Sequence, residues 1–347
     1  MPNETELRRV IAVGASMGGP DALRTFVGHL EAALPAAVLI VQHQAPDSPQ
    51  LLADILSKAG ALPAAYAVDS EPLQPRRIYL ARPDRHLVVE DGRIRVMAGP
   101  RENRTRPAID PLFRSTAVAY GSRAVGVLLT GMLHDGTAGL DAIRRCGGVT
   151  MVQNPVDAAY PDMVNNALAA MDVDHCLPLV ELAELLNRLV YSPLTQSPPV
   201  PEDLWLEVAF SQRAMGGSEL MDEIAQATSF TCPDCGGRLW ELASAGQPRY
   251  RCEVGHAFSA ASLVRGNRDG VEQSLWAALR ALEERERMLD RLAASSEANG
   301  RHKTALDYHE RAAETKKHRT QLRQFMLAWI QAAEWGNKPY NAPESEG

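Results

Sequence analysis

The sequence lacks any apolar run long enough to cross a membrane, which takes about 20 residues in a helix. Residues 1–8 are polar and lack the apolar core of a secretory signal peptide. Cysteine is also scarce, with five in 347 residues, and those of the second half fall in two close groups. Grouped cysteines in a chain without a secretion signal favour a metal site over disulfides. These absences predict a cytoplasmic protein that does not insert into membranes.

An excess of positive charge is absent as well. Lysine and arginine number 36 against 43 aspartates and glutamates, which gives a net charge of −7 at pH 7. Proteins that bind nucleic acid broadly need a basic surface, so no nucleic-acid partner is expected, although a local basic patch is still compatible with this balance.

The first stretch with candidate reactive residues is 9–20, a short apolar run followed by a glycine-rich turn. Ser16 lies where a buried strand gives way to a helix over 20–34, beside backbone N–H groups that glycine leaves uncovered. A helix N-terminus favours developing negative charge, which suits a nucleophile. The alternative is a phosphate-binding loop of a nucleotide-binding enzyme, although the spacing G-x-S-x-G-G differs from G-x-G-x-x-G. This stretch alone leaves both readings open.

Apolar runs and helical patterns alternate along residues 8–191. This order predicts an α/β domain with a mainly parallel, doubly wound sheet covered on both faces. Segments 77–81, 86–90 and 93–96 alternate instead like partly exposed strands, and Asp91-Gly92 predicts an inserted β-hairpin. The other expected strands are 36–42, 66–68, 124–130 and 149–152. The other expected helices are 48–58, 110–120, one that follows the glycine-rich segment 131–139 and ends at 145, 162–170 and 179–190.

Three reactive side chains follow apolar strands at their carboxyl ends: Ser16, His43 and Asp135. In a parallel sheet these ends share one edge, so the three residues are expected to meet there. They would supply a hydroxyl nucleophile, a base and a carboxylate that orients the base. Taken singly, His43 can be a structural strand-end residue and Asp135 a helix N-cap. His134 is a rival base, but its neighbour Asp135 is badly placed to orient it.

Motifs in order along residues 10–190 resemble the catalytic domain of the bacterial chemotaxis protein-glutamate methylesterases, the CheB family. They include Val13-Gly14-Ala15-Ser16-Met17-Gly18-Gly19, Val41-Gln42-His43, Leu73-Gln74-Pro75, Ile78-Tyr79-Leu80-Ala81, Pro83-Asp84-Arg85-His86, Arg106-Pro107-Ala108-Ile109-Asp110 and Leu129-Thr130-Gly131-Met132 with Asp135-Gly136.

The resemblance implies a serine hydrolase that removes methyl esters from glutamate side chains of methylated chemoreceptors and also deamidates glutamine. Ser16 would be the nucleophile, His43 the general base and acid, and Asp135 its orienting partner. Met132 matches the position whose backbone N–H serves the oxyanion hole, and Met17 and Gly18 are assigned to the same oxyanion and substrate-binding region. No cofactor is expected for catalysis.

The chain departs from the family pattern near this cleft. Met17 stands where family members often have threonine, Gln44-Ala45-Pro46 replaces Met-Pro, and Leu133 replaces glycine. These changes concern the substrate surface more than the chemistry. The family's receiver domain has no counterpart in the sequence, so control by phosphorylation within the chain is not expected.

A second constellation consists of Cys232, Cys235, Cys252 and His256. The C-x2-C and C-x3-H spacings predict a closed, tetrahedral zinc site with a structural role, against the alternative of disulfides. Cys146 and Cys176 lie in apolar surroundings and are expected to be core residues.

The second half divides into a linker at 192–203, a zinc-ribbon-like module at 228–265 and a helical hairpin at 269–335, broken at Asn299-Gly300. Apolar stripes on the two helices favour packing against each other, with self-association through helices as an alternative. The linker predicts that this part controls access or targeting and contributes little to the chemistry. The competing reading of the whole chain is a zinc-ribbon regulator that binds protein or nucleic acid on a degenerate esterase scaffold.

Overall fold

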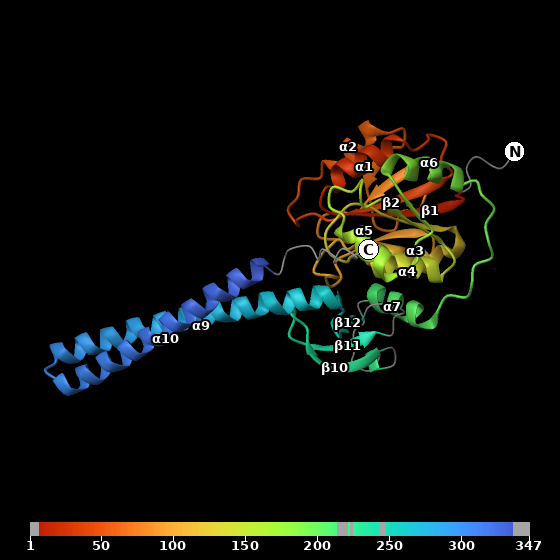
Figure 1. Ribbon diagram of the computed structural model, residues 1–347. Coiled ribbons are helices and arrows are strands. Elements are labelled where there is room, and N and C mark those ends of the chain that lie inside the picture. The colour runs from red at the N-terminus through yellow and green to blue at the C-terminus, as the bar shows by residue number, and fades with distance from the viewer. Residues whose placement is uncertain (1–6, 214–220, 223–224, 243–247, 336–347) are drawn as a thin grey trace, which may run out of the picture. The chain divides into compact units, whose positions relative to one another are not determined.

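The computed structural model describes residues 7–213, 221–222, 225–242 and 248–335. The chain divides into two compact units, Met1–Val264 and Arg265–Gly347. The first contains the α/β domain and the cysteine-rich segment, and the second contains most of two long helices (Figure 1). We describe each unit by itself.

A seven-stranded sheet in the order β3-β4-β2-β1-β7-β8-β9 forms the centre of the α/β domain, and every neighbouring pair is parallel. β1 lies in the middle, where the strand order turns from one side of the sheet to the other. Its seven residues are all buried, as expected for a strand covered on both faces. The strands are β1 (Arg9–Ala15), β2 (Ala36–Gln42), β3 (Ala64–Tyr66), β4 (Arg77–Leu80), β7 (Ala124–Leu128), β8 (Val149–Gln153) and β9 (His175–Leu177).

Helices cover both faces of this sheet (Figure 1). One face carries α1 (Gly19–Gly28), α2 (Leu52–Ala59) and α6 (Leu179–Leu189), and the other carries α3 (Ile109–Tyr120), α4 (Thr137–Arg145) and α5 (Asp162–Ala170). Fully buried Phe26 and Phe113 belong to the cores on the two faces, and burying such a ring contributes about 1.5–3 kcal/mol. The predicted doubly wound parallel sheet is confirmed.

Two details of the sheet differ from the sequence prediction. The segment 77–81, predicted as partly exposed, forms β4, a buried parallel strand between β3 and β2. The inserted hairpin, in contrast, is found as predicted and consists of β5 (His86–Glu90) and β6 (Arg93–Met97). The edge strand β9 was not predicted, and it leaves Cys176 exposed rather than in the core, whereas Cys146 is buried as expected.

The segment predicted as a linker, 192–203, lies along the α/β domain. The Ser122 hydroxyl donates a hydrogen bond to the Thr195 carbonyl oxygen, and the Ser122 N–H donates to the Ser197 hydroxyl. Its last two residues are helical, because α7 (Glu202–Arg213) begins there, and Asp203 pairs with Arg145 at 2.6 Å. This helix was not predicted, because the Pro- and Ser-rich residues before it obscure its pattern.

The cysteine-rich segment forms a four-stranded antiparallel sheet in the order β10-β11-β12-β13. We call these strands, with the first residues of α9 to Val264, the Cys/His module. The strands are β10 (Ala225–Thr231), β11 (Arg238–Leu242), β12 (Arg249–Cys252) and β13 (Ala257–Ser259), and α9 (Ala260–Ala298) follows directly. The long helix therefore starts nine residues earlier than its predicted beginning at 269.

The second unit is an antiparallel helical hairpin, as predicted. Ion pairs Glu286–Arg319 (3.2 Å) and Glu283–Arg323 (3.9 Å) link α9 to α10 (His302–Trp335). The helices part at Gly300, whose φ of +69° favours glycine. The buried residues of this unit include Leu279, Leu289, Ala293, Ala305, Ala312 and Met326. Self-association through these helices stays a prediction.

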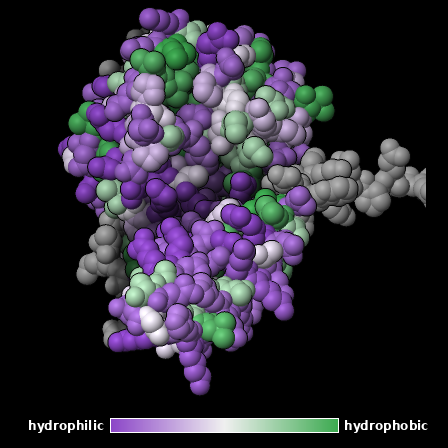
Figure 2. Space-filling model, turned by 90° about the vertical axis from the view of Figure 1, so that its left-hand side faces the viewer, coloured by the Kyte–Doolittle hydropathy of each residue, from purple (hydrophilic) through white to green (hydrophobic). Residues whose placement is uncertain are grey.

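Within the described part of the chain, we find no helix with the length and apolar character that a membrane crossing requires. One face of the molecule is mainly hydrophilic, and its apolar residues form separate groups (Figure 2).

Candidate active site

Ser16 and His43 are neighbours because β1 and β2 are parallel and in register. Ala15 lies opposite Gln42, so the next residue of each strand leaves the sheet at the same edge. The His43 N–H donates to the Ala15 carbonyl oxygen at 3.0 Å, and His43 Nδ1 lies 3.1 Å from Ser16 Oγ. The hydroxyl and the imidazole are therefore within hydrogen-bonding distance.

Asp135 lies on the other side of the same imidazole. Its Oδ2 atom is 2.7 Å from His43 Nε2. An ionised carboxylate only accepts hydrogen bonds, so Nε2 carries the hydrogen of the neutral ring and Nδ1 is free to accept the Ser16 proton. The structure thus brings together the three residues singled out in the sequence, and the carboxylate selects the tautomer that leaves Nδ1 basic.

Five N–H groups converge on the Asp135 carboxylate. Besides His43 Nε2, they are the backbone N–H groups of Ile109 (2.6 Å), Asp110 (3.2 Å) and Gly136 (3.1 Å) and the amide of Asn103 (3.1 Å). Burial alone would raise the pKa of Asp135, but these hydrogen bonds outweigh it, with that of His43 the strongest, and hold it at about 2. The group is therefore a carboxylate at neutral pH, held at the N-terminus of α3.

A second buried carboxyl group, Asp110, lies beside Asp135. It accepts hydrogen bonds from the N–H groups of Gly136 (3.0 Å) and Gly139 (2.6 Å) and from the Asn103 amide (2.9 Å). Burial and the charge of Asp135 raise the pKa of Asp110 to about 7. The Asn103 amide, which donates to both carboxyl groups, reduces the repulsion between them.

The backbone of residues 130–132 runs against the nucleophile. A Cβ atom placed on Gly131 would lie 2.7 Å from Ser16 Cβ, so only glycine allows this approach. Across the described ranges we find no acceptor for the N–H groups of Met17, Gly18 and Met132. These are the predicted oxyanion and substrate positions, and their N–H groups remain available to a ligand.

The Gln42 side chain contacts both members of the Ser16–His43 pair. Buried Gln42 donates through Nε2 to the carbonyl oxygens of Ser16 and His43, both at 2.8 Å, and so fixes the backbone of both residues. Sequence reasoning missed this role. For the ring of His134, the rival base, no hydrogen bond to Ser16 or Asp135 is found among the described residues, where both pair with His43 instead. Burial lowers the pKa of His134.

A buried ion network links the α/β domain to the Cys/His module. Glu102 pairs with Arg114 of α3 (2.6 Å) and with Arg251 of β12 (2.9 Å). Glu207 of α7 pairs with Arg251 (3.1 Å) and Arg249 (2.5 Å). Removing one partner of a buried pair typically costs about 3–5 kcal/mol, because the other charge is left unpaired. The predicted separation of the module from the α/β domain is therefore not what the structure shows.

Electrostatics keep both glutamates of this network ionised. Burial alone would raise the pKa of Glu102, but Arg114 and Arg251 hold it at about 2. The pKa of Glu207 is likewise held well below its usual value by Arg114, Arg249 and Arg251, against the effect of burial. The module is thus attached by charges that stay paired at neutral pH.

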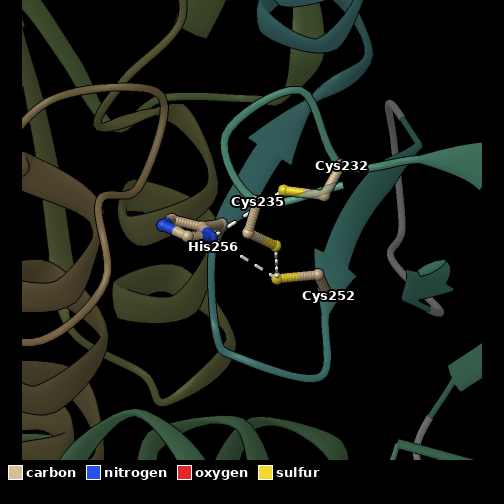
Figure 3. Close-up of side chains that lie close together, drawn as sticks. All are labelled: Cys232, Cys235, Cys252 and His256. Atoms are coloured by element: carbon tan, nitrogen blue, oxygen red, sulfur yellow. Dashed lines mark hydrogen bonds between the residues drawn. The ribbon is translucent and has the colours of Figure 1, made fainter. Parts of the chain in front are cut away.

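The four predicted metal ligands lie together in the Cys/His module (Figure 3). Cys235 Sγ is 3.7 Å from Cys252 Sγ, and His256 Nδ1 is 3.8 Å from Cys232 Sγ and 3.6 Å from Cys252 Sγ. A sulfur–sulfur distance of 3.7 Å is far from the roughly 2.05 Å of a disulfide. Zn–S bonds of about 2.3 Å and a Zn–N bond of about 2.05 Å give tetrahedron edges of about 3.8 Å and 3.6 Å, close to these three distances. All four ligand atoms lie within 4.8 Å of one another, so the cluster can hold zinc.

Two tight turns carry these ligands. In the first, the Gly236 N–H donates to the Cys232 carbonyl oxygen at 2.8 Å, and Gly236 has φ +75°. In the second, the Gly255 N–H donates to the Cys252 carbonyl oxygen at 2.9 Å, and Gly255 has φ +109°. The glycines allow the chain to turn while both ligands of each turn face the same centre.

Comparison with known proteins finds similarity in the N-terminal half of the chain, which forms the α/β domain. The family model described as CheB methylesterase matches residues 11–186. The chain is 43% identical over 187 residues to protein-glutamate methylesterase/protein-glutamine glutaminase 3 of Anaeromyxobacter dehalogenans (strain 2CP-C), covering 53% of this chain and 55% of that protein. It is 38% identical over 186 residues to protein-glutamate methylesterase/protein-glutamine glutaminase of Yersinia pestis, covering 52% of each.

A solved structure shares the fold. The crystal structure of the Thermotoga maritima CheB methylesterase catalytic domain matches with a TM-score of 0.50 and 29% identity, covering 52% of this chain and 98% of that one. The chain spans about half the length of the curated relatives it matches. The similarity thus covers the α/β domain that holds Ser16, His43 and Asp135.

Proposed function

The chain belongs to the CheB methylesterase family, and on this premise we propose that it is a serine hydrolase that removes methyl esters from glutamate side chains of a methylated chemoreceptor. The observation that carries the proposal is the hydrogen-bonded series Ser16 Oγ, His43 and Asp135. Glutamine deamidation at the same site follows from the same chemistry, because both reactions transfer a side-chain acyl group to water.

The reaction runs in two halves. Ser16 Oγ attacks the ester carbonyl while His43 Nδ1 takes its proton, and Asp135 stabilises the imidazolium that forms. The N–H groups of Met17, Gly18 and Met132 are available for the negative oxygen of the tetrahedral intermediate. His43 then protonates the departing methoxide, which leaves as methanol. Water, activated by His43, releases the glutamate from Ser16.

This chemistry needs no cofactor, unlike the alternative of a nucleotide-binding enzyme. Cytoplasmic action is part of the proposal, because free cysteine thiols persist in a reducing compartment. A binding role for a degenerate esterase scaffold is less favoured, since the three reactive side chains are in hydrogen-bonding contact.

Methanol release from a methylated receptor tests the function. The purified chain, with no added nucleotide, is expected to release methanol from a chemoreceptor cytoplasmic fragment methylated with a radioactive methyl group. The control is the same fragment with its methylated glutamates replaced by alanine. Absence of methanol from the methylated fragment, while a small ester is still hydrolysed, would show that the substrate is another ester.

We also propose that Cys232, Cys235, Cys252 and His256 hold a structural zinc ion. Support comes from the fit of their distances to a tetrahedral site and from the two glycine turns. Four protein ligands leave no open position, so the ion would hold the module together and would not take part in hydrolysis.

Metal analysis tests the zinc site. We expect about one zinc per chain in the wild type and a large loss in Cys235→Ser, because three ligands bind zinc much more weakly than four. Exposed Cys176 offers a matched control, and Cys176→Ser should keep its zinc. Undiminished zinc in Cys235→Ser, or a different metal in the wild type, would contradict the assignment.

A further inference from the structure

Asn103 connects the Asp135 carboxylate to the Cys/His module, and its surroundings allow one orientation of its amide. Nδ2 faces two carboxylate oxygens, of Asp135 (3.1 Å) and Asp110 (2.9 Å). Oδ1 faces two donors, the Ser259 N–H (2.9 Å) and the Ser262 hydroxyl (3.1 Å). A flipped amide would set oxygen against carboxylates and N–H against N–H, so the four contacts define the orientation.

The module also fixes the backbone of Asn103. The Asn103 N–H donates to the Ala257 carbonyl oxygen at 2.7 Å. The residue has φ +49°, a left-handed conformation that asparagine tolerates better than most residues. Both the backbone and the side chain of this loop residue are therefore held by β13 and the start of α9.

The holding residues follow a predicted metal ligand directly. Ala257 is the next residue after His256, and the Cys252 N–H donates to the His256 carbonyl oxygen at 3.0 Å. Ser259 directly precedes α9 and caps it, since its hydroxyl accepts the Ser262 N–H at 3.2 Å as an N-cap does. A metal bound by Cys252 and His256 would therefore fix the turn from which Ala257, Ser259 and Ser262 reach Asn103.

We propose that Asn103 is a positioning residue for the hydrolase and that the metal-bound Cys/His module sets its position, so that loading of the metal controls the rate of hydrolysis. The proposal rests on the proposed function. Among the described residues, the Asn103 side chain makes no hydrogen bond to Ser16 or His43. It acts through Asp135, to which it donates while it also bridges the neighbouring Asp110.

The expected effect is on the rate of the chemical step. Losing one hydrogen bond to a buried charge corresponds to a change of roughly 10- to 100-fold. Without the Asn103 donor, the Asp135 carboxylate is held less rigidly and orients His43 less well, which lowers the rate. The carboxylate also becomes more basic and holds the proton of protonated His43 more strongly. The acid limb of the pH profile of kcat/KM should therefore move to higher pH. KM for a small ester should stay the same, because the Asn103 amide is hydrogen-bonded to Asp135, Asp110 and the module and not to the nucleophile.

The first measurement compares Asn103→Gly with wild type on 4-nitrophenyl acetate, using the full chain loaded with zinc. Glycine removes the amide without strain at positive φ. Asn187→Ala is the matched control, since buried Asn187 also bridges two segments but contacts Glu31 and His29, remote from the triad. We expect Asn103→Gly to lower kcat by roughly 10- to 100-fold and to shift the acid limb, and Asn187→Ala to change neither. An unshifted profile with full kcat would overturn the positioning role.

The second measurement is a thermodynamic cycle that combines zinc removal with Asn103→Gly and measures the coupling between the metal and Asn103. Zinc removal by EDTA should lower kcat of the wild type and of the Asn187→Ala control about equally. It should lower kcat of Asn103→Gly much less, because that variant already lacks the hydrogen bond from Asn103 to Asp135. Ser262→Ala removes one donor to Asn103 and keeps Asn103 itself, so its loss of kcat on zinc removal should lie between those of the wild type and Asn103→Gly. Ser274→Ala is its control, because the Ser274 hydroxyl donates to the Gly270 carbonyl oxygen within α9. Equal losses on zinc removal in wild type and Asn103→Gly would refute the coupling while leaving the esterase intact.

A spectroscopic readout keeps this proposal separate from the proposed function. The His43 Nε2 proton, bonded to Asp135, should give a downfield proton NMR signal that is absent in His43→Gln. Zinc removal and Asn103→Gly should each shift or broaden it, whether or not any ester is hydrolysed. A chain that shows this response but hydrolyses no ester would refute the proposed function alone, and an unmoved signal would refute the positioning role.

Discussion

Replacing Ser16 with alanine is expected to lower kcat for ester hydrolysis by about 10⁴-fold or more, the loss typical of a missing triad nucleophile. Alanine keeps the Cβ atom that lies against Gly131 and removes only the hydroxyl that contacts His43 Nδ1. The fold should therefore be unchanged, and the entire loss should fall on the chemistry. The measurement is the initial rate with 4-nitrophenyl acetate, together with covalent labelling by a serine-directed fluorophosphonate.

A second serine of the same domain provides the control. Ser57 is exposed and its hydroxyl bonds to the Ala64 backbone, so Ser57→Ala should keep both the rate and the labelling. Labelling that persists in Ser16→Ala, or a rate within a few-fold of wild type, would exclude Ser16 as the nucleophile.

Replacing Asp135 with asparagine is the second large effect that we expect, with a loss in kcat of about 10⁴-fold. The asparagine amide can no longer hold the hydrogen of His43 on Nε2, so the tautomer with a basic Nδ1 is disfavoured. The structure adds a consequence that the sequence does not indicate. The five partners of this carboxylate found in the described part of the chain are all N–H donors. The N–H₂ group of an asparagine would therefore have to face donors, and the variant should also be less stable.

Rate and stability are therefore measured side by side, as kcat well below the unfolding transition and as the midpoint of thermal unfolding. The control is Asp174→Asn, an aspartate that accepts from Thr150 at the far side of the sheet. It should keep the rate. If Asp135→Asn stays folded with an unchanged rate, another group orients His43 and the assignment of Asp135 is wrong.

The fold class and the three reactive side chains could be predicted from the sequence, because both depend on local patterns. Fully apolar runs such as β1 read as strands buried on both faces, and residues that follow such runs necessarily share the carboxyl edge of a parallel sheet. Ser16, His43 and Asp135 could therefore be proposed together from three separated strand ends. The family resemblance, seen in the order of the motifs, is confirmed by the match over residues 11–186.

Errors arose where burial is decided by neighbours distant in sequence. β4 carries charged and aromatic residues that alternate like an exposed strand, but it is buried because β2 and β3 flank it and the helices cover it. α7 follows a Pro- and Ser-rich stretch whose composition predicts a linker, and only the tertiary structure shows this helix packed on the α/β domain through contacts such as Asp203–Arg145. Cys176 lies among apolar residues in sequence and yet is exposed on an edge strand.

The sequence by itself determined the doubly wound sheet, the edge where the three reactive side chains meet, the four clustered Cys and His residues and the break between the long helices. Each of these follows from a short-range period or spacing. Only the tertiary structure decided that the Cys/His module lies against the α/β domain and reaches Asp135 through Asn103. Asn103 and Ser259 are separated by 156 positions, and a hydrogen bond over that distance leaves no pattern in the local sequence because chain folding alone creates it.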